Sequence, residues 1–304
     1  MRYVTSLTML VAIVLLAACG TPVAPSPEPT EPAPAATEAP QPAATEAPQP
    51  TATEAALSGE ITLAGSTSVQ PLAEALGNAF MAMYPDVAVT VQGGGSSVGV
   101  KSAGEGTVDI GTSSREVKDE ELAQYPDLVI HTIARDGIAI VVHPDVPVDA
   151  LTKDQVKGIY EGSITMWNEV GGPSVPIVVV GREEGSGTRG AFGSLVMGDE
   201  EFAMVATAIL QPSNGAVVTT VSTTPASIGF ISFGYIDEST KPLAMDGIEP
   251  TVANALSGEY PVVRPFNMLT KGEPTGLAEA FLDYVLSDEG QAIVADEGYL
   301  SVTA

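Results

Sequence analysis

The chain has 304 residues and a formal net charge of −26, from 12 basic and 38 acidic side chains. This acidic balance excludes a nucleic-acid partner, because binding to nucleic acid depends on neutralising phosphates with lysine and arginine. The single cysteine excludes a disulfide framework and a cysteine-based metal site. The length allows a substantial core and two globular units.

The N-terminal segment has the pattern of an export signal. Residues 4–17 form an apolar run that follows Arg2 and ends in small residues before Cys19. The run is too short to span a bilayer, so residues 1–19 are a predicted signal peptide. Because LAAC resembles a bacterial lipobox, Cys19 is the predicted lipidation site. We therefore expect an extracytoplasmic protein, in a periplasm or at a cell surface, attached to the membrane only through this lipid.

Residues 20–57 are rich in Pro, Ala, Thr and Glu and repeat the unit ATEAPQPA. Such a composition buries too little apolar surface to offset its ordering entropy, which predicts a disordered tether. The first 57 residues hold five glutamates and one arginine, so 33 acidic and 11 basic residues, or −22, remain for the globular part. Net charge governs solubility and long-range steering, whereas nearby dipoles govern a buried site, so an anion-binding site is still compatible with this charge.

Two segments then place small polar residues between a strand and a helix. LAGSTSVQPLAEAL, residues 63–76, has Ser and Thr between a short strand and a helix with apolar positions at three- and four-residue steps. VTVQGGGSSVGVKSA, residues 89–103, has three glycines and two serines at the same point. Unpaired backbone N–H groups at a helix start favour an anion, and glycine lets the backbone approach it. Both segments are predicted anion cradles.

The third and most informative cradle is VVVGREEGSGTRGAF, residues 178–192. An apolar run leads through a tight turn into a helix that opens with Ser186 and Thr188, whose hydroxyls can donate hydrogen bonds. Arg182 adds a planar guanidinium that matches two oxygens of an oxyanion. Helix capping explains the same serines and threonines, since capping and anion binding use one geometry, and surface ion pairing is the alternative for the arginines.

Other conspicuous residues indicate structure instead of a site. Trp167, the sole tryptophan, is expected to be packed in the interior. His131 and His143 lack partners at metal-ligand spacing, so no metal site is expected. Asn214, in PSNGAV, is expected to be a turn residue, with a position near the site as the alternative.

The order of elements predicts an α/β fold. Apolar runs with β-branched residues alternate with helical patterns along the chain, which is the signature of α/β layers. The predicted strands are residues 87–91, 128–133, 138–143, 176–180 and 228–233.

Together with IARDGIAIVVHPDVPVDALTKDQVKGIYEGSITMWNEVGGP, ASIGFISFGYID and RPFNMLTKGEPTGLAEAFLDYVLSDEGQ, the three cradles closely resemble substrate-binding lipoproteins of phosphate-specific ATP-binding cassette (ABC) transporters. The resemblance runs from about residue 60 to the C-terminus without a large gap. It implies a two-lobed periplasmic-binding-protein fold, type II-like, with ligand in the cleft between the lobes and two chain crossings as a hinge. The implied first lobe is residues 58–136 plus 238–304, and the second is 137–237.

The resemblance also implies a set of phosphate contacts, carried over where the motifs match: Thr67, Ser68, Ser96, Ser97, Ser114, Arg115, Arg182, Ser186, Gly187 and Thr188. Many members of the family have an aspartate at the position of Ser114, where it accepts the proton of hydrogen phosphate. A carboxylate there rejects sulfate, which brings no proton. In this chain Asp109 or Glu184 can substitute, or the site relies on hydroxyls and Arg115.

The implied function is capture of inorganic phosphate and delivery to an ABC transporter permease, by a monomer without cofactor, metal or catalytic residues. The alternatives are a binding protein for another tetrahedral oxyanion and a sensor that presents phosphate to a receptor. Enzyme motifs fail: Gly185, Gly187 and Gly190 satisfy GxGxxG, yet residues 202–236 contain no acid to hold a ribose. The turn at 184–188 lacks the outer glycines of a hydrolase nucleophile elbow.

Overall fold

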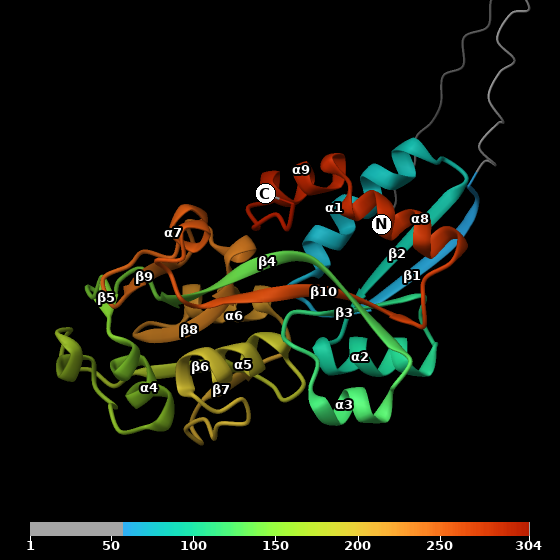
Figure 1. The fold of residues 1–304 in the computed structure, drawn as a ribbon. Coiled ribbons are helices and arrows are strands. Elements are labelled where there is room, and N and C mark those ends of the chain that lie inside the picture. The colour runs from blue at the N-terminus through green and yellow to red at the C-terminus, as the bar shows by residue number, and fades with distance from the viewer. Residues whose placement is uncertain (1–56, 304) are drawn as a thin grey trace, which may run out of the picture. The chain divides into compact units, whose positions relative to one another are not determined.

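The computed structural model describes residues 57–303, which lie within one compact unit. Within this range a ten-stranded mixed sheet has the strand order β2-β1-β3-β10-β4-β8-β6-β7, and β9 pairs with β4 and β5 (Figure 1). No helix of the described residues is long and apolar enough to cross a membrane. The predicted signal peptide, Cys19 and most of the predicted tether lie outside the described residues.

The strands are β1 Gly59–Gly65, β2 Val87–Gly93, β3 Ile110–Ser113, β4 Leu128–Val142, β5 Ala150–Leu151, β6 Val178–Arg182, β7 Ile209–Gln211, β8 Ser227–Ser232, β9 Lys241–Met245 and β10 Val263–Lys271. The α-helices are α1 Gln70–Met83, α2 Ser96–Glu105, α3 Asp119–Gln124, α4 Lys153–Glu161, α5 Gly187–Phe192, α6 Asn214–Thr223, α7 Val252–Ser257, α8 Gly276–Leu286 and α9 Asp288–Asp296. Short helices of other types are η1 Trp167–Val170, η2 Gly193–Met197 and η3 Phe233–Tyr235. The α/β prediction is confirmed, and each cradle leads from a strand into a helix.

Two large hydrophobic clusters form separate cores in the described chain. Core A joins β1, α1, α8 and α9, with Leu72 and Phe281 fully buried in it. Core B surrounds the second half of β4 and the strand β8, and includes Phe192 and Trp167. Trp167 has no exposed surface and donates from Nε1 to the carbonyl of Ala226 at 2.8 Å, so the prediction that it is interior packing is confirmed.

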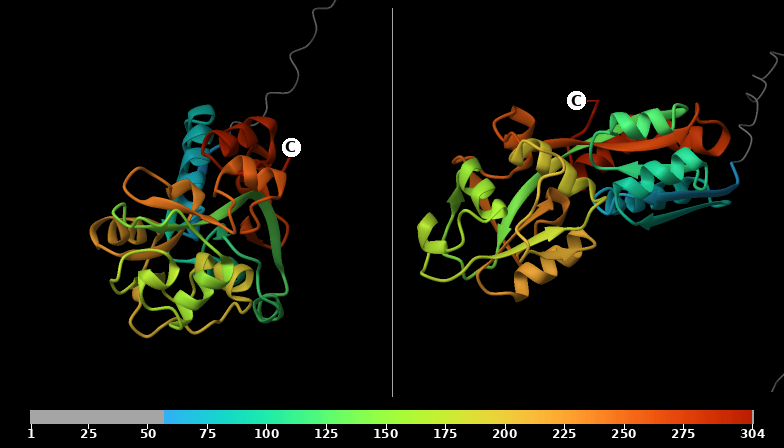
Figure 2. Two further views of the ribbon diagram at one scale, coloured as in Figure 1. Left: turned by 90° about the vertical axis from the view of Figure 1, so that its left-hand side faces the viewer. Right: turned by 90° about the horizontal axis from the view of Figure 1, so that it is seen from below.

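Among the strands of the described residues, only β4 and β10 contribute to both cores, and Figures 1 and 2 show them as long ribbons joining two halves. Ile133 of β4 belongs to core A and Ile138 to core B, while in β10 Phe266 belongs to core A and Val263 packs on core B. The predicted strands 128–133 and 138–143 are therefore parts of one 15-residue strand. The polar break between the two runs does not end the strand, because neighbouring strands pair with it on either side of that point.

The packing bears on the predicted lobe boundary at 237/238. β9 pairs with β4 and with β5, and both Tyr260 and Val262 belong to core B. Residues 241–262 therefore pack with the predicted second lobe, which was expected to contain only residues 137–237. The lobe boundaries remain a proposal, and this packing favours a second crossing near Val263 in β10.

Candidate anion-binding site

The cradles meet because of the strand order. β1 pairs in parallel with both β2 and β3, so the loops that follow these three strands lie at one edge of the sheet. These loops carry Ser68, Ser96 and Ser114. From the other core, the loop after β6 brings Ser186 and the start of α5 to the same place, where Ser97 donates its backbone N–H to the carbonyl of Gly185 at 3.1 Å.

Ser68 is the point on which donors from distant segments converge. Its Oγ shares a hydrogen bond of 2.8 Å with Thr188 Oγ1, and it accepts hydrogen bonds from Asn214 Nδ2 at 2.8 Å and Arg264 Nη2 at 3.0 Å. All four side chains are buried. Ser68 and Arg264 come from the core A side, whereas Thr188 and Asn214 begin helices of the core B side.

A second group of hydroxyls lies beside this one. Ser66 Oγ donates to Ser114 Oγ at 2.8 Å, and Ser96 Oγ accepts from the backbone N–H of Ser114 at 3.0 Å. Gly187 approaches so closely that a Cβ atom there would overlap Ser96 Oγ and lie 2.6 Å from Ser114 Oγ. The opening residues of α5 therefore face these serines directly.

Thr67 and Ser186 occupy the margins of the arrangement. Both are buried, and the Thr67 carbonyl accepts a hydrogen bond of 2.7 Å from Tyr235. Ser186 is the N-cap of α5, where its Oγ accepts from the backbone N–H of Arg189 at 3.3 Å. Capping uses the acceptor of Ser186 and leaves its hydroxyl proton as a donor, so both interpretations of this residue are compatible.

Arg182 lies in the interior with its side chain only 1% exposed. Nε donates to the carbonyl of Gln211 at 2.9 Å, and Nη2 donates to Pro212 and to Glu183 at 3.1 Å. Its Nη1 is buried without a hydrogen-bond partner. An unpartnered guanidinium nitrogen is costly unless a ligand satisfies it.

Arg115, a predicted ligand contact, is already engaged with other side chains. Its guanidinium donates to both carboxylate oxygens of Glu121, at 2.7 and 2.8 Å, and to Ser97 Oγ at 3.1 Å. Burial alone would raise the pKa of Glu121, but the hydrogen bonds from Arg115 and the backbone of Lys118 lower it. Arg115 and Ser97 thus belong to an ion-paired group beside the serines, lining a cavity of about 310 Å³.

The two suggested substitutes for the missing aspartate do not reach the serines. Asp109 Oδ2 accepts from the backbone N–H and the hydroxyl of Thr62, both at 2.8 Å, near the middle of β1. Glu184 is exposed and lines the same cavity as Arg115. Neither carboxylate forms a hydrogen bond with a predicted contact among the described residues.

The buried carboxylate of this region is Asp136, which the sequence analysis missed together with Arg264. The two are direct cross-strand partners in β4 and β10, joined by hydrogen bonds of 2.8 and 3.0 Å to Asp136 Oδ2. Burial raises the pKa of Asp136 and lowers that of Arg264, and their mutual attraction opposes both shifts. Arg264 is a lone charge inside the apolar run VVRPF, and that signal was available in the sequence. Asp136 directly follows Arg135, so no such signal marks it in the sequence.

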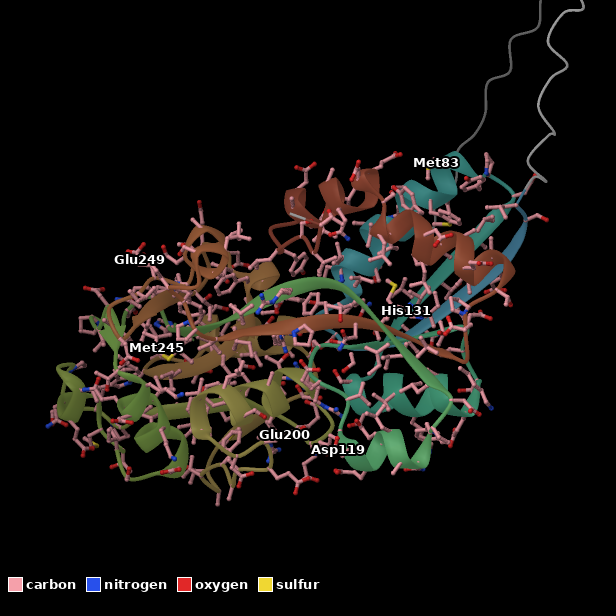
Figure 3. All side chains as sticks on the ribbon, in the orientation of Figure 1. Met83, Asp119, His131, Glu200, Met245 and Glu249 are labelled. Atoms are coloured by element: carbon pink, nitrogen blue, oxygen red, sulfur yellow. The ribbon has the colours of Figure 1, made fainter. Side chains whose placement is uncertain are left out.

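An ionic latch, formed by Arg115 and Lys118 with Glu200 and Glu201, joins the two sides at the rim of the cavity. Lys118 Nζ lies 3.3 Å from Glu200 Oε1 and 3.1 Å from Glu201 Oε1, and Arg115 Nε lies 3.7 Å from Glu200. In Figure 3 the labels of Glu200 and of Asp119, the residue after Lys118, mark this place. Burial opposes the charge on Lys118, but hydrogen bonds and attraction to these glutamates raise its pKa overall.

Replacing Lys118 with alanine is expected to speed ligand release about two- to fivefold, because partly exposed ion pairs contribute roughly 0.2–1 kcal/mol each. Release should also depend less on salt, which screens such pairs. Stopped-flow measurement of release at several salt concentrations tests this. Lys241→Ala, which removes a lysine that pairs with the exposed Asp149, is the matched control. A release rate for Lys118→Ala equal to that of the control would mean that the latch does not hold the closed form.

The fold and this site define a two-lobed class of substrate-binding protein, and comparisons with known proteins agree. The family model of the PBP superfamily domain matches residues 50–289. The phosphate-binding protein PstS of Bacillus subtilis is 39% identical over 248 residues, covering 81% of this chain and 82% of the relative. The chain belongs to the PstS family within the PBP superfamily.

Solved structures give the same result. A Clostridium perfringens chain, solved with bound phosphate as a candidate phosphate ABC transporter substrate-binding protein, superposes with a TM-score of 0.77 and 42% identity, covering 80% of this chain and 100% of its own. An ABC-type phosphate transport receptor from Vibrio cholerae has a TM-score of 0.67 and 36% identity, covering 79% of this chain and 99% of its own.

Proposed function

We propose that this protein binds inorganic phosphate between its two lobes, outside the cytoplasmic membrane, and delivers it to the permease of an ABC transporter. The observation that carries the proposal is the convergence of buried donors around Ser68, together with the buried and unpartnered Nη1 of Arg182. The names of the relatives and the phosphate bound in a similar structure support it.

Each of the proposed contacts can present a donor to an anion. Hydroxyls can rotate toward an anion, and the backbone N–H groups at the start of α5 and α2 point away from their helices. Hydrogen bonds from charged donors to an oxyanion are stronger than neutral ones, and more so where water is excluded. We retain as proposed contacts Thr67, Ser68, Ser96, Ser114, Arg182, Ser186, Gly187 and Thr188, and place Ser97 and Arg115 at the rim.

Calorimetric titration of the purified protein with phosphate, arsenate, sulfate and molybdate tests the proposal. Phosphate is expected to bind at least as tightly as any of the other anions. Failure of phosphate to bind while another anion binds would replace this function with that of another oxyanion carrier. A sensor would bind phosphate equally well, but a permease reconstituted with it would show no uptake.

Catalysis is not part of the proposal. His131 Nε2 is hydrogen-bonded to Thr270 at 3.0 Å, and His143 Nδ1 accepts from the backbone of Asp145 at 3.2 Å. In the described part of the chain neither histidine bonds to a serine of the site, as a nucleophile and its base would. The same residues contain no cluster of three or more His, Cys, Asp or Glu suited to a metal.

Ser114 leads to a prediction about selectivity. With only donors facing the ligand, the wild-type protein is expected to bind sulfate detectably at millimolar concentration, because a fully deprotonated oxyanion meets no opposing acceptor. Ser114→Asp should raise the ratio of phosphate to sulfate affinity, measured by calorimetry. The matched control is Ser174→Asp, which introduces the same charge at an exposed serine and should leave the ratio unchanged. Complete rejection of sulfate by the wild type would mean that a carboxylate already faces the ligand.

We also propose a monomer anchored through a lipid at Cys19, with residues 20–57 as a disordered tether between the lipid and the globular part. Deleting the tether is expected to leave phosphate affinity unchanged, because a disordered segment contributes no contact to the site. Calorimetry on the full and shortened proteins measures this, and Cys19→Ala should release the protein from the membrane fraction. A large loss of affinity in the shortened protein would assign the segment a structural function.

A further inference from the structure

Three guanidinium groups are buried in this region, those of Arg115, Arg182 and Arg264, and Arg115 is paired with Glu121. One carboxylate, that of Asp136, is buried with them. The side chains of Arg182 and Arg264 are each 1% exposed, and that of Asp136 is fully buried. Arg264 is matched by Asp136, whereas the acidic neighbour of Arg182, Glu183, has a side chain 36% exposed. Burying a cation whose ion-pair partner stays partly exposed is costly, so an anion bound beside Arg182 would offset this cost.

Arg264 uses all five of its N–H donors, in two different ways. Nε and Nη2 hold Asp136, and Nη1 donates to the Ser114 carbonyl at 3.1 Å. The remaining two donors go to side-chain hydroxyls of the proposed site, Ser114 Oγ at 3.2 Å and Ser68 Oγ at 3.0 Å. Hydroxyl oxygens are weaker acceptors than an oxyanion and can rotate away, so these two donors are the ones that a ligand can take over.

Asp136 fixes the direction of the guanidinium. Its Oδ1 accepts from the backbone N–H of Phe233 at 3.2 Å, and its Oδ2 accepts two hydrogen bonds from Arg264. The carboxylate therefore lies behind the guanidinium and does not face the serines. The pair also lies on the part of β4 and β10 that joins the two cores, where the proposed lobes converge.

We propose that Arg264 is a second guanidinium contact of the bound oxyanion, next to Ser68 and Ser114, and that Asp136 is the positioning residue that orients it. This inference rests on the proposed function. It adds a ligand-binding residue outside the three cradles, on a strand instead of a helix start. Asp136 would then affect the bound anion only through Arg264.

The first experiment titrates Arg264→Lys with inorganic phosphate by calorimetry. Lysine keeps the charge beside Asp136 but cannot direct donors to the aspartate, Ser68 and Ser114 together, so affinity should fall about 10- to 100-fold. The matched control is Arg135→Lys, the same change on β4 at an exposed side chain, and it should bind within about twofold of wild type. Wild-type affinity for Arg264→Lys would overturn the proposal.

The second experiment separates binding from folding. Arg264→Gln leaves Asp136 unpaired and should lower the unfolding temperature, whereas Arg264→Gln combined with Asp136→Asn removes both charges and should restore stability. The double variant should still bind phosphate at least about 30-fold more weakly than wild type. Recovery of wild-type affinity in the double variant would show that the pair is only structural.

Asp136 is tested by its dependence on Arg264. Asp136→Asn should weaken phosphate binding in the wild-type background and have no further effect in Arg264→Gln, because a positioning residue acts through its partner. Equal effects in both backgrounds would overturn this assignment. The wild-type titration distinguishes this inference from the proposed function. If the wild-type protein does not bind phosphate, the proposed function is refuted. If it binds phosphate and the Arg264 variants bind equally well, only this inference is refuted.

Discussion

Arg182→Ala is expected to weaken phosphate binding by about 2–5 kcal/mol, because the substitution removes one partner of a desolvated charge pair. Nη1 of Arg182 is buried without a partner, and no other described side chain of the region presents such a free donor from a charged group. Calorimetric titration measures the loss. Wild-type affinity in the variant would remove Arg182 from the site.

The same substitution should also affect folding. Arg182 donates to the carbonyls of Gln211 and Pro212, so its removal leaves these acceptors without a donor and should lower the free energy of unfolding by about 1–3 kcal/mol. The titration is therefore carried out well below the unfolding temperature of the variant. Arg135→Ala, an exposed arginine, controls for the loss of one positive charge, and it should change neither quantity appreciably.

Gly187→Ala is expected to reduce phosphate affinity about 10- to 100-fold, because an added methyl group overpacks a close contact of the closed form. The added Cβ would overlap Ser96 Oγ and lie 2.6 Å from Ser114 Oγ, so the start of α5 could no longer approach the serines of the opposite side. Ligand-free stability should stay nearly constant, because each core remains packed as before and alanine suits a helix.

The control for this variant is Gly215→Ala, in the first turn of α6. A Cβ atom at Gly215 would meet nothing closer than Tyr235 Cε1 at 3.8 Å, an ordinary contact. Calorimetry and thermal unfolding on both variants separate loss of closure from loss of folding. Equal affinities of the two variants would mean that the bound form does not bring Gly187 against Ser96 and Ser114.

Local rules account for what the sequence alone determined. Strand periodicity followed by small polar residues predicts the three strand-to-helix turns, and α1, α2 and α5 begin there. The hydroxyls of Ser68 and Thr188 were predicted from the same turns, because capping and anion binding need particular residue types within a few positions. Trp167, a large apolar side chain in a short glycine-bounded segment, was correctly expected to be buried.

Only the tertiary structure decided which residues these side chains contact. Arg264 and Asp136 lie 128 residues apart in sequence and meet because β10 runs antiparallel to β4. Asn214 was expected to be a turn residue, yet it donates to Ser68 across 146 residues. Arg115 looks equivalent to Arg182 in sequence, but Glu121 on the adjacent helix α3 takes its guanidinium. A residue type and its spacing determine what a side chain can donate, whereas strand order and packing determine which acceptor it reaches.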